Sequence, residues 1–507
     1  MRYGFVIDQN RCIGCHACTV ACKEEHNIAV GVNRTWVKYV EKGVYPETRR
    51  HFAVLRCNHC DDAPCIEICP TVALFRRHDG IVDFDNERCI GCKSCMQACP
   101  YDALYIDPER NTAAKCNFDA SRVEMGYKPA CEVVCPTQAI LSGDLDDPQS
   151  DISRRIAMDK VTVRKPEKGT KPKLFYAGVD GDLLTPSMME PQSSHFWAEK
   201  QPGEDLYALG NGNKRGPIPG GAREVYDVSH LIPWGKKIAT YLWTKSIAAG
   251  VLLLSTLFLH MGFQHDELVL NVFSPIVSLI FLTATMLLLV FDLKKPWRFF
   301  FLITKPNLNS WLTLGGYVLM IFGGLTVLWL AQRILTGAVS GLVTWTTALF
   351  AIASAGYSAF LFAQARGRDF WQSPLLFWHL LVQAVTAGAA TLTLIGVFAG
   401  VTVPMFYWLA NLIVISLFVG ATMIFVELFT KHGADDAVRS GELLTKGALR
   451  KSFWTLVIGV GTIVPVLLIL LPVGSVFPNV IAAGLALFGL WMYEHLWIKA
   501  GQAFPLS

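Results

Sequence analysis

The sequence lacks cysteine throughout its C-terminal part, because none of the 15 cysteines in this 507-residue chain occurs after Cys135. Disulfide scaffolds are short secreted chains, so a long chain with cysteines crowded into its first part does not fit that class. The chain also lacks a strong excess of charge, with 45 basic residues against 41 acidic ones and a net charge of +4. So small an excess does not indicate nucleic acid as a partner.

Two further features are missing from the first part of the chain. The N-terminus MRYGFVIDQNRC has no basic stretch followed by an apolar core. No signal peptide is therefore visible, and we expect the cysteines to stay in a reducing compartment. No long apolar run occurs before about residue 238, whereas such runs dominate the rest. This contrast predicts a cysteine-rich domain at 1–150, an extension and linker rich in Pro, Gly and Lys at 151–235, and a membrane domain at 236–507.

The cysteines fall into four groups with short, fixed spacings. Tight loops of this kind present three thiolates to one cubane iron–sulfur cluster, while the fourth thiolate reaches another cluster. Proline directly follows the last cysteine of three groups. The groups are Cys12-x2-Cys15-x2-Cys18-x3-Cys22, Cys57-x2-Cys60-x4-Cys65-x3-Cys69, Cys89-x2-Cys92-x2-Cys95-x3-Cys99, and Cys116 followed by Cys131-x3-Cys135.

Four clusters with four thiolates each would need one more cysteine than the chain contains. Asp119 stands at the expected place, separated from Cys116 by two residues. Carboxylate oxygen is a harder ligand than thiolate and a poorer match for an iron–sulfur cluster. Two outcomes stay open: a [4Fe–4S] cluster with Asp119 as ligand, or a [3Fe–4S] cluster without iron at that corner, which we favour. We expect [4Fe–4S] clusters at the other three positions.

Each unit of two motifs resembles the dicluster ferredoxin of bacteria, with strand-like segments at 2–7, 52–55, 81–84 and 103–106 between the motifs. The resemblance implies that the first motif pairs with the last and the second with the third, and that the domain has an α+β ferredoxin-like fold. We expect the first-and-last pair at the membrane end. The implied ligand sets are Cys12, Cys15, Cys18 and Cys135; Cys22, Cys116, Cys131 and Asp119; Cys57, Cys60, Cys65 and Cys99; and Cys69, Cys89, Cys92 and Cys95.

Eight apolar segments follow, each about 20 residues long, which is the length that crosses a bilayer as a helix. Buried helices of a soluble domain are the alternative. Eight such runs in succession, with Trp near several ends, favour an all-α transmembrane bundle in the lipid bilayer. The expected spans are 240–263, 269–291, 311–332, 341–364, 375–399, 405–430, 453–471 and 480–499.

The charges in the loops predict the orientation of the bundle. An even number of spans places both termini on one side, and the loops of that side are rich in Lys and Arg. By the positive-inside rule, the cysteine domain and both termini face the cytoplasm, which puts the bundle in the inner (cytoplasmic) membrane. The basic residues are Lys236, Lys237, Lys245, Lys294, Lys295, Arg298, Lys305, Arg366, Arg368, Lys431, Arg439, Lys446, Arg450 and Lys451.

Several stretches resemble the polysulfide-reductase-type membrane anchors of the NrfD family: FDLKKPWRFFFLITKPNLNSWLTLGG (291–316), FWHLLVQAVTAGAA (377–390), FWTLVIGVGTIVPVLLILLP (453–472) and GLWMYEHLWIKAGQAFPLS (489–507). The first 200 residues resemble the four-cluster electron-transfer subunits of molybdenum oxidoreductases. The chain is thus similar to a fusion of the two. The resemblance implies quinone or quinol chemistry without haem in the anchor, and a separate molybdopterin-containing catalytic subunit.

Residues inside the apolar spans give the candidate quinone site. The histidines His260, His379 and His495 lie at different depths and do not form a haem-ligand pair, so we expect electrons to pass directly between a cluster and a quinone at the cluster-side end of the bundle. Ionisable groups inside membrane spans indicate function, although Lys245 can also snorkel and the acids can pair with nearby bases. We expect the quinone and proton site at Tyr241, Lys245, Asp292, His379 and Glu427. Glu494 and His495 stand where the resemblance leads us to expect arginine, so their role is left open.

The sequence therefore predicts a membrane-anchoring subunit that relays electrons through four clusters between a molybdopterin catalytic subunit and menaquinone or ubiquinone. The direction of electron flow stays open, since quinol oxidation and quinone reduction need the same parts. The alternative is a proton-translocating module of a larger quinone-linked respiratory complex. Ionisable residues at mid-membrane on successive spans would favour that alternative, and the sequence contains few.

Overall fold

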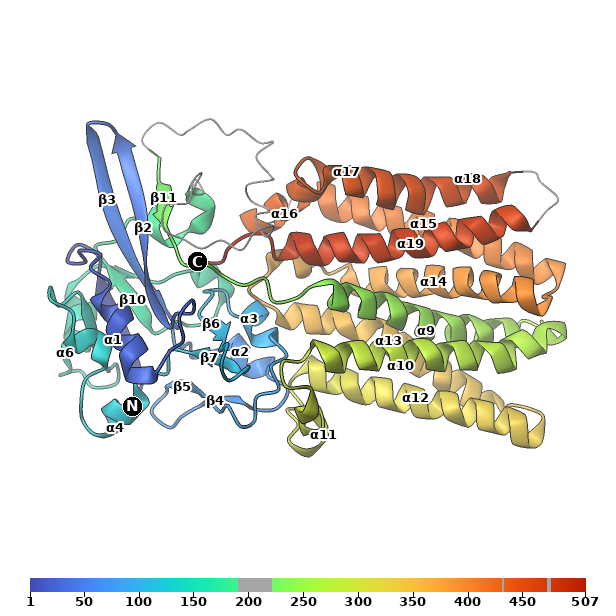
Figure 1. The fold of residues 1–507 in the computed structure, drawn as a ribbon, viewed down its shortest axis with the longest axis horizontal. Coiled ribbons are helices and arrows are strands. Elements are labelled where there is room, and N and C mark those ends of the chain that lie inside the picture. The colour runs from blue at the N-terminus through green and yellow to red at the C-terminus, as the bar shows by residue number, and fades with distance from the viewer. Residues whose placement is uncertain (190–220, 431–432, 472–475) are drawn as a thin grey trace.

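The computed structural model describes residues 1–189, 221–430, 433–471 and 476–507. It consists of a mixed α/β part at one end of the long axis and a bundle of helices at the other (Figure 1). Residues 190–220 of the expected linker, and Lys431 among the expected basic loop residues, lie outside the described residues.

A four-stranded sheet joins the two ends of the N-terminal part. Strand β1 (Tyr3–Asp8) pairs antiparallel with β8 (Ile140–Asp144) and parallel with β10 (Leu174–Ala177), which in turn pairs with β9 (Val161–Thr162). Helix α6 (Asp151–Met158) packs its buried Ile152 against this sheet. The pairing brings the chain after the fourth motif back to the strand before the first motif, so these two motifs become neighbours.

A long hairpin of β2 (Thr35–Val44) and β3 (Glu47–Arg56), joined by β11 (Arg223–Tyr226), projects from this part (Figure 1). The last four residues of β3 are buried and lead directly into Cys57. Two small hairpins, β4 (Leu74–Arg76) with β5 (Val82–Phe84) and β6 (Leu104–Ile106) with β7 (Ala113–Lys115), separate the later motifs. Each strand-like segment expected from the sequence overlaps a strand: β1, β3, β5 and β6.

Each cysteine motif combines a tight loop with a short helix. The loop reverses the direction of the chain within a few residues. Such turns need a positive φ, and the residue before the second ligand position of every motif adopts it: Gly14 (φ 70°), His59 (44°), Gly91 (70°) and Phe118 (64°). The four loops therefore share one backbone turn. The helices are α1 (Ala17–His26), α2 (Pro64–Glu67), α3 (Ser94–Ala98), α4 (Ala120–Glu124) and α5 (Ala130–Val133).

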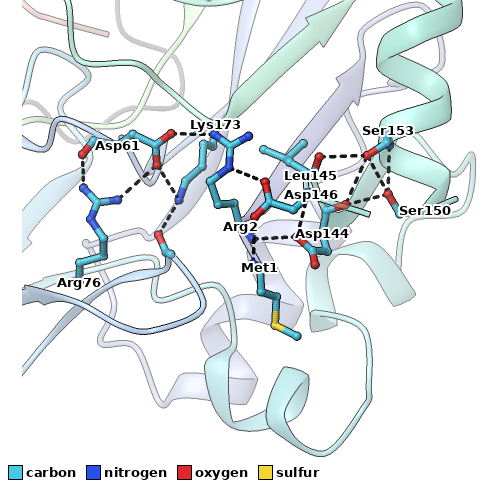
Figure 2. Close-up of polar contacts among 11 residues, drawn as sticks. Met1, Arg2, Asp61, Arg76, Asp144, Leu145, Asp146, Ser150, Ser153 and Lys173 are labelled. Atoms are coloured by element: carbon cyan, nitrogen blue, oxygen red, sulfur yellow. Dashed lines mark hydrogen bonds and ion pairs between the residues drawn. The ribbon is translucent and has the colours of Figure 1, made fainter. Parts of the chain in front are cut away.

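A network of charged side chains ties the second motif to the sheet (Figure 2). Asp61, which directly follows Cys60, accepts from Arg2 at 3.1 Å and Arg76 at 3.4 Å and pairs with Lys173 at 3.3 Å. Arg2 also donates to Asp146 at 2.7 Å, beyond the end of β8. Single exposed ion pairs contribute about 0–1 kcal/mol, so this network acts mainly by fixing the position of the loop relative to the sheet.

The second part contains eight helices long and apolar enough to cross a membrane among the described residues, as the sequence predicts. Helices α9 and α14 are the most enclosed of them. They touch backbone to backbone, since a Cβ added to Gly250 would lie 1.8 Å from the carbonyl oxygen of Ala384. The spans are α9 (Lys236–His260), Val269–Asp292 with α10 (Ser274–Asp292), α12 (Trp311–Thr336), α13 (Gly341–Gln364), α14 (Leu376–Ala399), α15 (Val403–Phe429), Arg450–Leu470 with α17 (Arg450–Ser452) and α18 (Val464–Leu470), and α19 (Phe477–Gly501).

Shorter helices complete the described structure. Helix α7 (Gly181–Leu184) follows the sheet, α11 (Phe301–Thr304) lies at the cluster-side end of the bundle, and α16 (Asp435–Thr445) lies between α15 and α17. Residues 269–273 and 453–463 form π-helical turns. The fold is thus an α+β ferredoxin-like domain followed by an all-α bundle, as predicted.

Candidate iron–sulfur centres and membrane site

Four thiols from two motifs line a small cavity beside the bundle. The remaining walls are largely apolar and include Leu74, Phe84 and Ile90. Four thiols around one small apolar cavity fit a cubane cluster, because each thiolate of such a cluster binds a different iron. The cysteines are Cys69, Cys89, Cys92 and Cys95, one of the sets implied by the ferredoxin resemblance.

A second small cavity is lined by another of these sets. Its wall also contains Val82, Tyr101 and Leu104. The Tyr101 hydroxyl is held by a hydrogen bond to Thr170 at 2.6 Å, which keeps its polar atom satisfied in this apolar wall. The cysteines here are Cys57, Cys60, Cys65 and Cys99.

The thiols of the first motif meet the fourth motif at the other end of the domain. Burial raises the pKa of Cys12, and nearby Cys135 and Cys15 raise it further. Burial likewise raises the pKa of Cys18 to about 11. A buried neutral thiol becomes a ligand when a metal ion displaces its proton. These thiols can therefore bind a positively charged metal centre.

The group around Asp119 combines three buried thiols with a carboxylate. Burial raises the pKa of Cys22, with further contributions from Cys116, Cys131 and Asp119, so the four lie close enough to interact. Burial also raises the pKa of Cys116 to about 12. Three thiols and one carboxylate therefore share this site, as the resemblance implies.

Both carboxylate oxygens of Asp119 already accept hydrogen bonds. His26 donates through Nε2 to Oδ1, and the amide of Ala130 donates to Oδ2 at 2.7 Å. Burial opposes ionisation of Asp119, but the hydrogen bond and charge of His26 outweigh it and leave the pKa of Asp119 below its usual value. Asp119 also caps α4 in the left-handed region (φ 51°), whereas in the first and third motifs the capping residues, His16 and Lys93, follow the second cysteine.

No group of three or more His, Cys, Asp or Glu side chains in the described ranges converges closely enough to hold a single metal ion. The two cysteine cavities have a different geometry, in which the thiols lie around a space rather than at one point. A cubane cluster spreads its four ligands over four irons. The observed spread is compatible with that cofactor.

Arg56 is a feature of this site that the sequence analysis missed. Its side chain is fully buried, and Nη1 donates to the sulfur of Cys131 at 3.0 Å. Burial disfavours its charge, but the thiols of Cys131, Cys116 and Cys18 raise the pKa of Arg56 above its usual value. A sequence signal existed, because a basic residue directly precedes the first cysteine of every motif: Arg11, Arg56, Arg88 and Lys115.

The bundle docks against the cavity of Cys69, Cys89, Cys92 and Cys95. Asn307 donates to the carbonyl of Cys69 at 2.8 Å, Arg298 to that of Cys89 at 3.0 Å, and Trp234 to that of Cys92 at 3.5 Å. Two segments, the residues just before α9 and the connection between α10 and α12, thus contact three of the four cysteines of this cavity.

The close fit of this interface depends on one glycine. Gly91 (φ 70°) lies so near the turn after α10 that an added Cβ would be 2.6 Å from Cβ of Lys294. The amide of Lys294 donates to the carbonyl of Gly91 at 3.2 Å. A side chain at this position would therefore separate the two parts.

The expected order of the clusters is corrected by this docking. We expected the first and fourth motifs at the membrane end, but the second and third motifs are there, and α1 lies at the opposite end of the domain (Figure 1). Cys15 is exposed, whereas the cysteines next to the bundle are buried or half-buried. The loops of 294–313 make the difference, because they bind the carbonyls of the second and third motifs.

Four of the expected membrane-site residues lie inside the cluster-side half of the bundle. Tyr241 and Lys245 are buried on α9, and Lys245 donates to the carbonyl of Ala355 at 3.0 Å and to Ser358 at 2.6 Å. His379 is buried on α14, and its Nδ1 lies 3.7 Å from Glu427 of α15. Glu427 also accepts from Ser373 at 2.6 Å.

Asp292 differs from the other four, because it pairs with the cysteine domain. Its carboxylate lies 2.7 Å from the ammonium of Lys93, between Cys92 and Cys95 in sequence, and both side chains are largely buried. Asp292 is also the last residue of α10. It therefore connects the third motif to the residues inside the bundle.

Cysteine loops of the dicluster type joined to eight apolar helices define a multi-pass membrane protein with an iron–sulfur domain. Comparison with family models agrees. Residues 3–24 match a 4Fe–4S binding domain, 49–145 match a 4Fe–4S dicluster domain, and 224–506 match the family described as polysulphide reductase, NrfD. The last match spans more than half of the chain, so the chain belongs to the NrfD family.

Curated relatives match the N-terminal part. A tetrathionate reductase subunit of Salmonella typhimurium is 44% identical over 202 residues, which are 39% of this chain and 80% of that protein. A polysulfide reductase polypeptide of Wolinella succinogenes is 43% identical over 34% of this chain and 93% of its own length. The arsenate respiratory reductase iron–sulfur subunit ArrB of a Shewanella strain is 35% identical over 35% and 96%. The chain is accordingly an iron–sulfur electron-transfer subunit fused to an NrfD membrane anchor.

Proposed function

We propose that this chain relays electrons through four iron–sulfur clusters between a molybdopterin-containing catalytic subunit and membrane quinone, either menaquinone or ubiquinone. One observation carries the proposal: a cavity lined by four cysteines lies directly against the end of the bundle where Tyr241, Lys245 and His379 are buried and Glu427 is partly buried. A quinone bound there would exchange electrons with a cluster and protons with these side chains.

The cofactors that fit the thiol groups are three [4Fe–4S] clusters and one [3Fe–4S] cluster. Iron–sulfur clusters supply one-electron transfer at each site, and the protein supplies the ligands and their surroundings. The proposed three-iron cluster is held by Cys22, Cys116 and Cys131. The hydrogen bonds that engage both oxygens of Asp119 support this choice over a carboxylate ligand.

The far end of the domain suits a redox partner. Cys15 is exposed there, and three apolar side chains of the same two motifs are exposed with it: Ile13 (57%), Val20 (63%) and Val133 (63%). Exposed apolar surface around an electron-transfer centre marks a docking site. Because the similar proteins are named as parts of reductases, a catalytic subunit is the partner proposed for this surface.

The proposed location is the inner membrane, with the cysteine domain and both termini in the cytoplasm. The excess of Lys and Arg in the loops on that side supports this orientation. Protease added to intact spheroplasts should leave the domain uncut, and protease added to inverted vesicles should digest it. Digestion of the domain in spheroplasts but not in inverted vesicles would contradict the proposed orientation.

The function is tested by mixing the purified chain, under anaerobic conditions, with a short-chain quinol or, after dithionite reduction, with the corresponding quinone. Redox change of the visible cluster absorbance in either direction supports the proposal. A second arm identifies the polypeptide that co-purifies with the tagged chain, which should contain molybdopterin. Clusters that respond to dithionite but to neither quinol nor quinone would contradict the quinone assignment.

Replacing Arg56 should change the reduction potential of the cluster next to Cys131. The buried guanidinium donates to the Cys131 sulfur, and a nearby cation favours the more negative, reduced state of a cluster. Arg56→Gln is therefore expected to lower the potential of that cluster most in an EPR-monitored redox titration, to lower that of the neighbouring cluster at Cys18 less, and to leave the two clusters of the second and third motifs unchanged. Arg49→Gln, an exposed arginine of the same strand, is the control and should shift none. An unchanged potential in Arg56→Gln would show that the hydrogen bond has no influence on the cluster.

A further inference from the structure

Glu494 of α19 is a buried carboxyl group without a partner among the described residues. Its side chain is 2% exposed, and neither Oε1 nor Oε2 has a hydrogen-bond partner within that part of the chain. A carboxylate enclosed in this way is strongly disfavoured unless it is protonated or binds something. Ionisable residues inside membrane spans are costly, and they commonly mark pathways of ion or proton transfer.

Helix α19 packs against α9, which carries the buried base Lys245. Lys245 is fully buried, and its ammonium lies 4.7 Å from the ring centre of Tyr357. The charges of Lys245 and Glu494 interact. However, no ion pair within 4.0 Å joins the two among the described residues, so the carboxyl group of Glu494 is not in direct contact with the ammonium of Lys245.

A second acid and base lie beside α19. Tyr493, the neighbour of Glu494, has its ring 5.2 Å from that of His379, which pairs with Glu427. The bundle thus holds two buried acid–base pairs that flank one tyrosine, and a quinol has two hydroxyl protons.

We propose that Glu494 and Lys245 form a proton-exchange pair for the quinone, and this inference rests on the proposed function. When a quinol is oxidised, it loses two electrons, which leave one at a time through the cysteine domain, and two protons. The carboxylate of Glu494 accepts the proton of one hydroxyl, and Lys245 stabilises the carboxylate before that transfer. The pair of His379 and Glu427 accepts the other proton. Quinone reduction uses the same steps in reverse.

The test compares Glu494→Gln, which keeps the shape but cannot exchange a proton, with Glu494→Asp, which keeps the acid. The control is His495→Gln at the next position. Cluster absorbance and reduction by dithionite report whether each variant is intact. With a short-chain quinol or quinone in the direction that the wild type supports, Glu494→Gln is expected to react on the order of 10²-fold more slowly. Glu494→Asp should recover part of the rate, and His495→Gln should keep it.

Redox-difference infrared spectra give a readout that a purely structural role would not produce. The wild-type protein should show a carboxyl band that changes with quinone redox state, shifts in Glu494→Asp and is absent in Glu494→Gln. If Glu494→Gln does not retain its clusters, the shift in Glu494→Asp decides. A wild-type rate in Glu494→Gln, or the same carboxyl band in all variants, would overturn the proposal. Failure of the wild type itself to react with quinol and quinone would instead refute the proposed function.

Discussion

The variant Asp119→Cys is expected to lose the EPR signal of an oxidised three-iron cluster and to gain one iron per chain. An oxidised [3Fe–4S] cluster has an odd number of unpaired electrons and gives a signal, whereas an oxidised [4Fe–4S] cluster is diamagnetic. A thiolate at this position completes the fourth ligand set with Cys22, Cys116 and Cys131. The measurement is low-temperature EPR of the air-free, oxidised protein, together with iron analysis.

The control for this experiment is Asp119→Asn, which removes the charge without supplying a thiolate. It should keep the three-iron signal of the wild type. A wild-type protein without this signal would show that Asp119 is a ligand of a four-iron cluster, and Asp119→Asn would then acquire the signal. The hydrogen bonds from His26 and Ala130 favour the first result, because they engage both oxygens.

Removing one cysteine of the cavity beside the bundle should stop electron exchange between quinone and all remaining clusters. We expect this of Cys95→Ala, because the hydrogen bonds from the bundle reach cysteine carbonyls of the second and third motifs, while the first motif lies at the far end of the domain. Electrons from the membrane would then lack their first acceptor. The measurement is anaerobic mixing with a short-chain quinol or quinone, followed by absorbance and EPR of each cluster.

The matched control is Cys12→Ala, which changes a cluster at the opposite end of the domain. In this variant the three other clusters should still exchange electrons with quinone. Reduction by dithionite shows for both variants that the remaining clusters are assembled. If the clusters of Cys95→Ala exchange electrons with quinone at the wild-type rate, the membrane-side acceptor is another cluster, and the cavity of Cys57, Cys60, Cys65 and Cys99 is the next to test.

Much of the fold could be predicted because it depends on local sequence. The apolar run at 341–364 coincides with α13, since the thickness of a bilayer sets the length of each helix. The run at 240–263 begins four residues after α9 does, because Lys236 and Lys237 are helical but charged. The cysteine spacings likewise determine the loops, whose turns share a positive φ at Gly14 and its three counterparts.

The predictions were less complete wherever distant segments meet. Asp292 was predicted at the quinone site, with pairing to a nearby base as the alternative, and the structure pairs it with Lys93, about 200 residues away in the chain. No local pattern predicts which base that is. Arg56 was missed because its position before a cysteine does not show that its side chain is buried. Only the fold brings it into contact with the sulfur of Cys131. Glu494 received no role because its isolation from partners among the described residues is a property of the packed bundle.

Spacing and hydropathy alone specified the four cysteine groups, the odd position at Asp119 and the eight spans, since both act over a few residues or one helix. Tertiary packing was needed to establish which cysteines lie beside the membrane and which acids face which bases. These neighbours are brought together by contacts between segments far apart in the chain, and no local pattern contains such contacts. The carbonyls of Cys69, Cys89 and Cys92 bind Asn307, Arg298 and Trp234, and this docking sets the end of the domain that lies against the bundle.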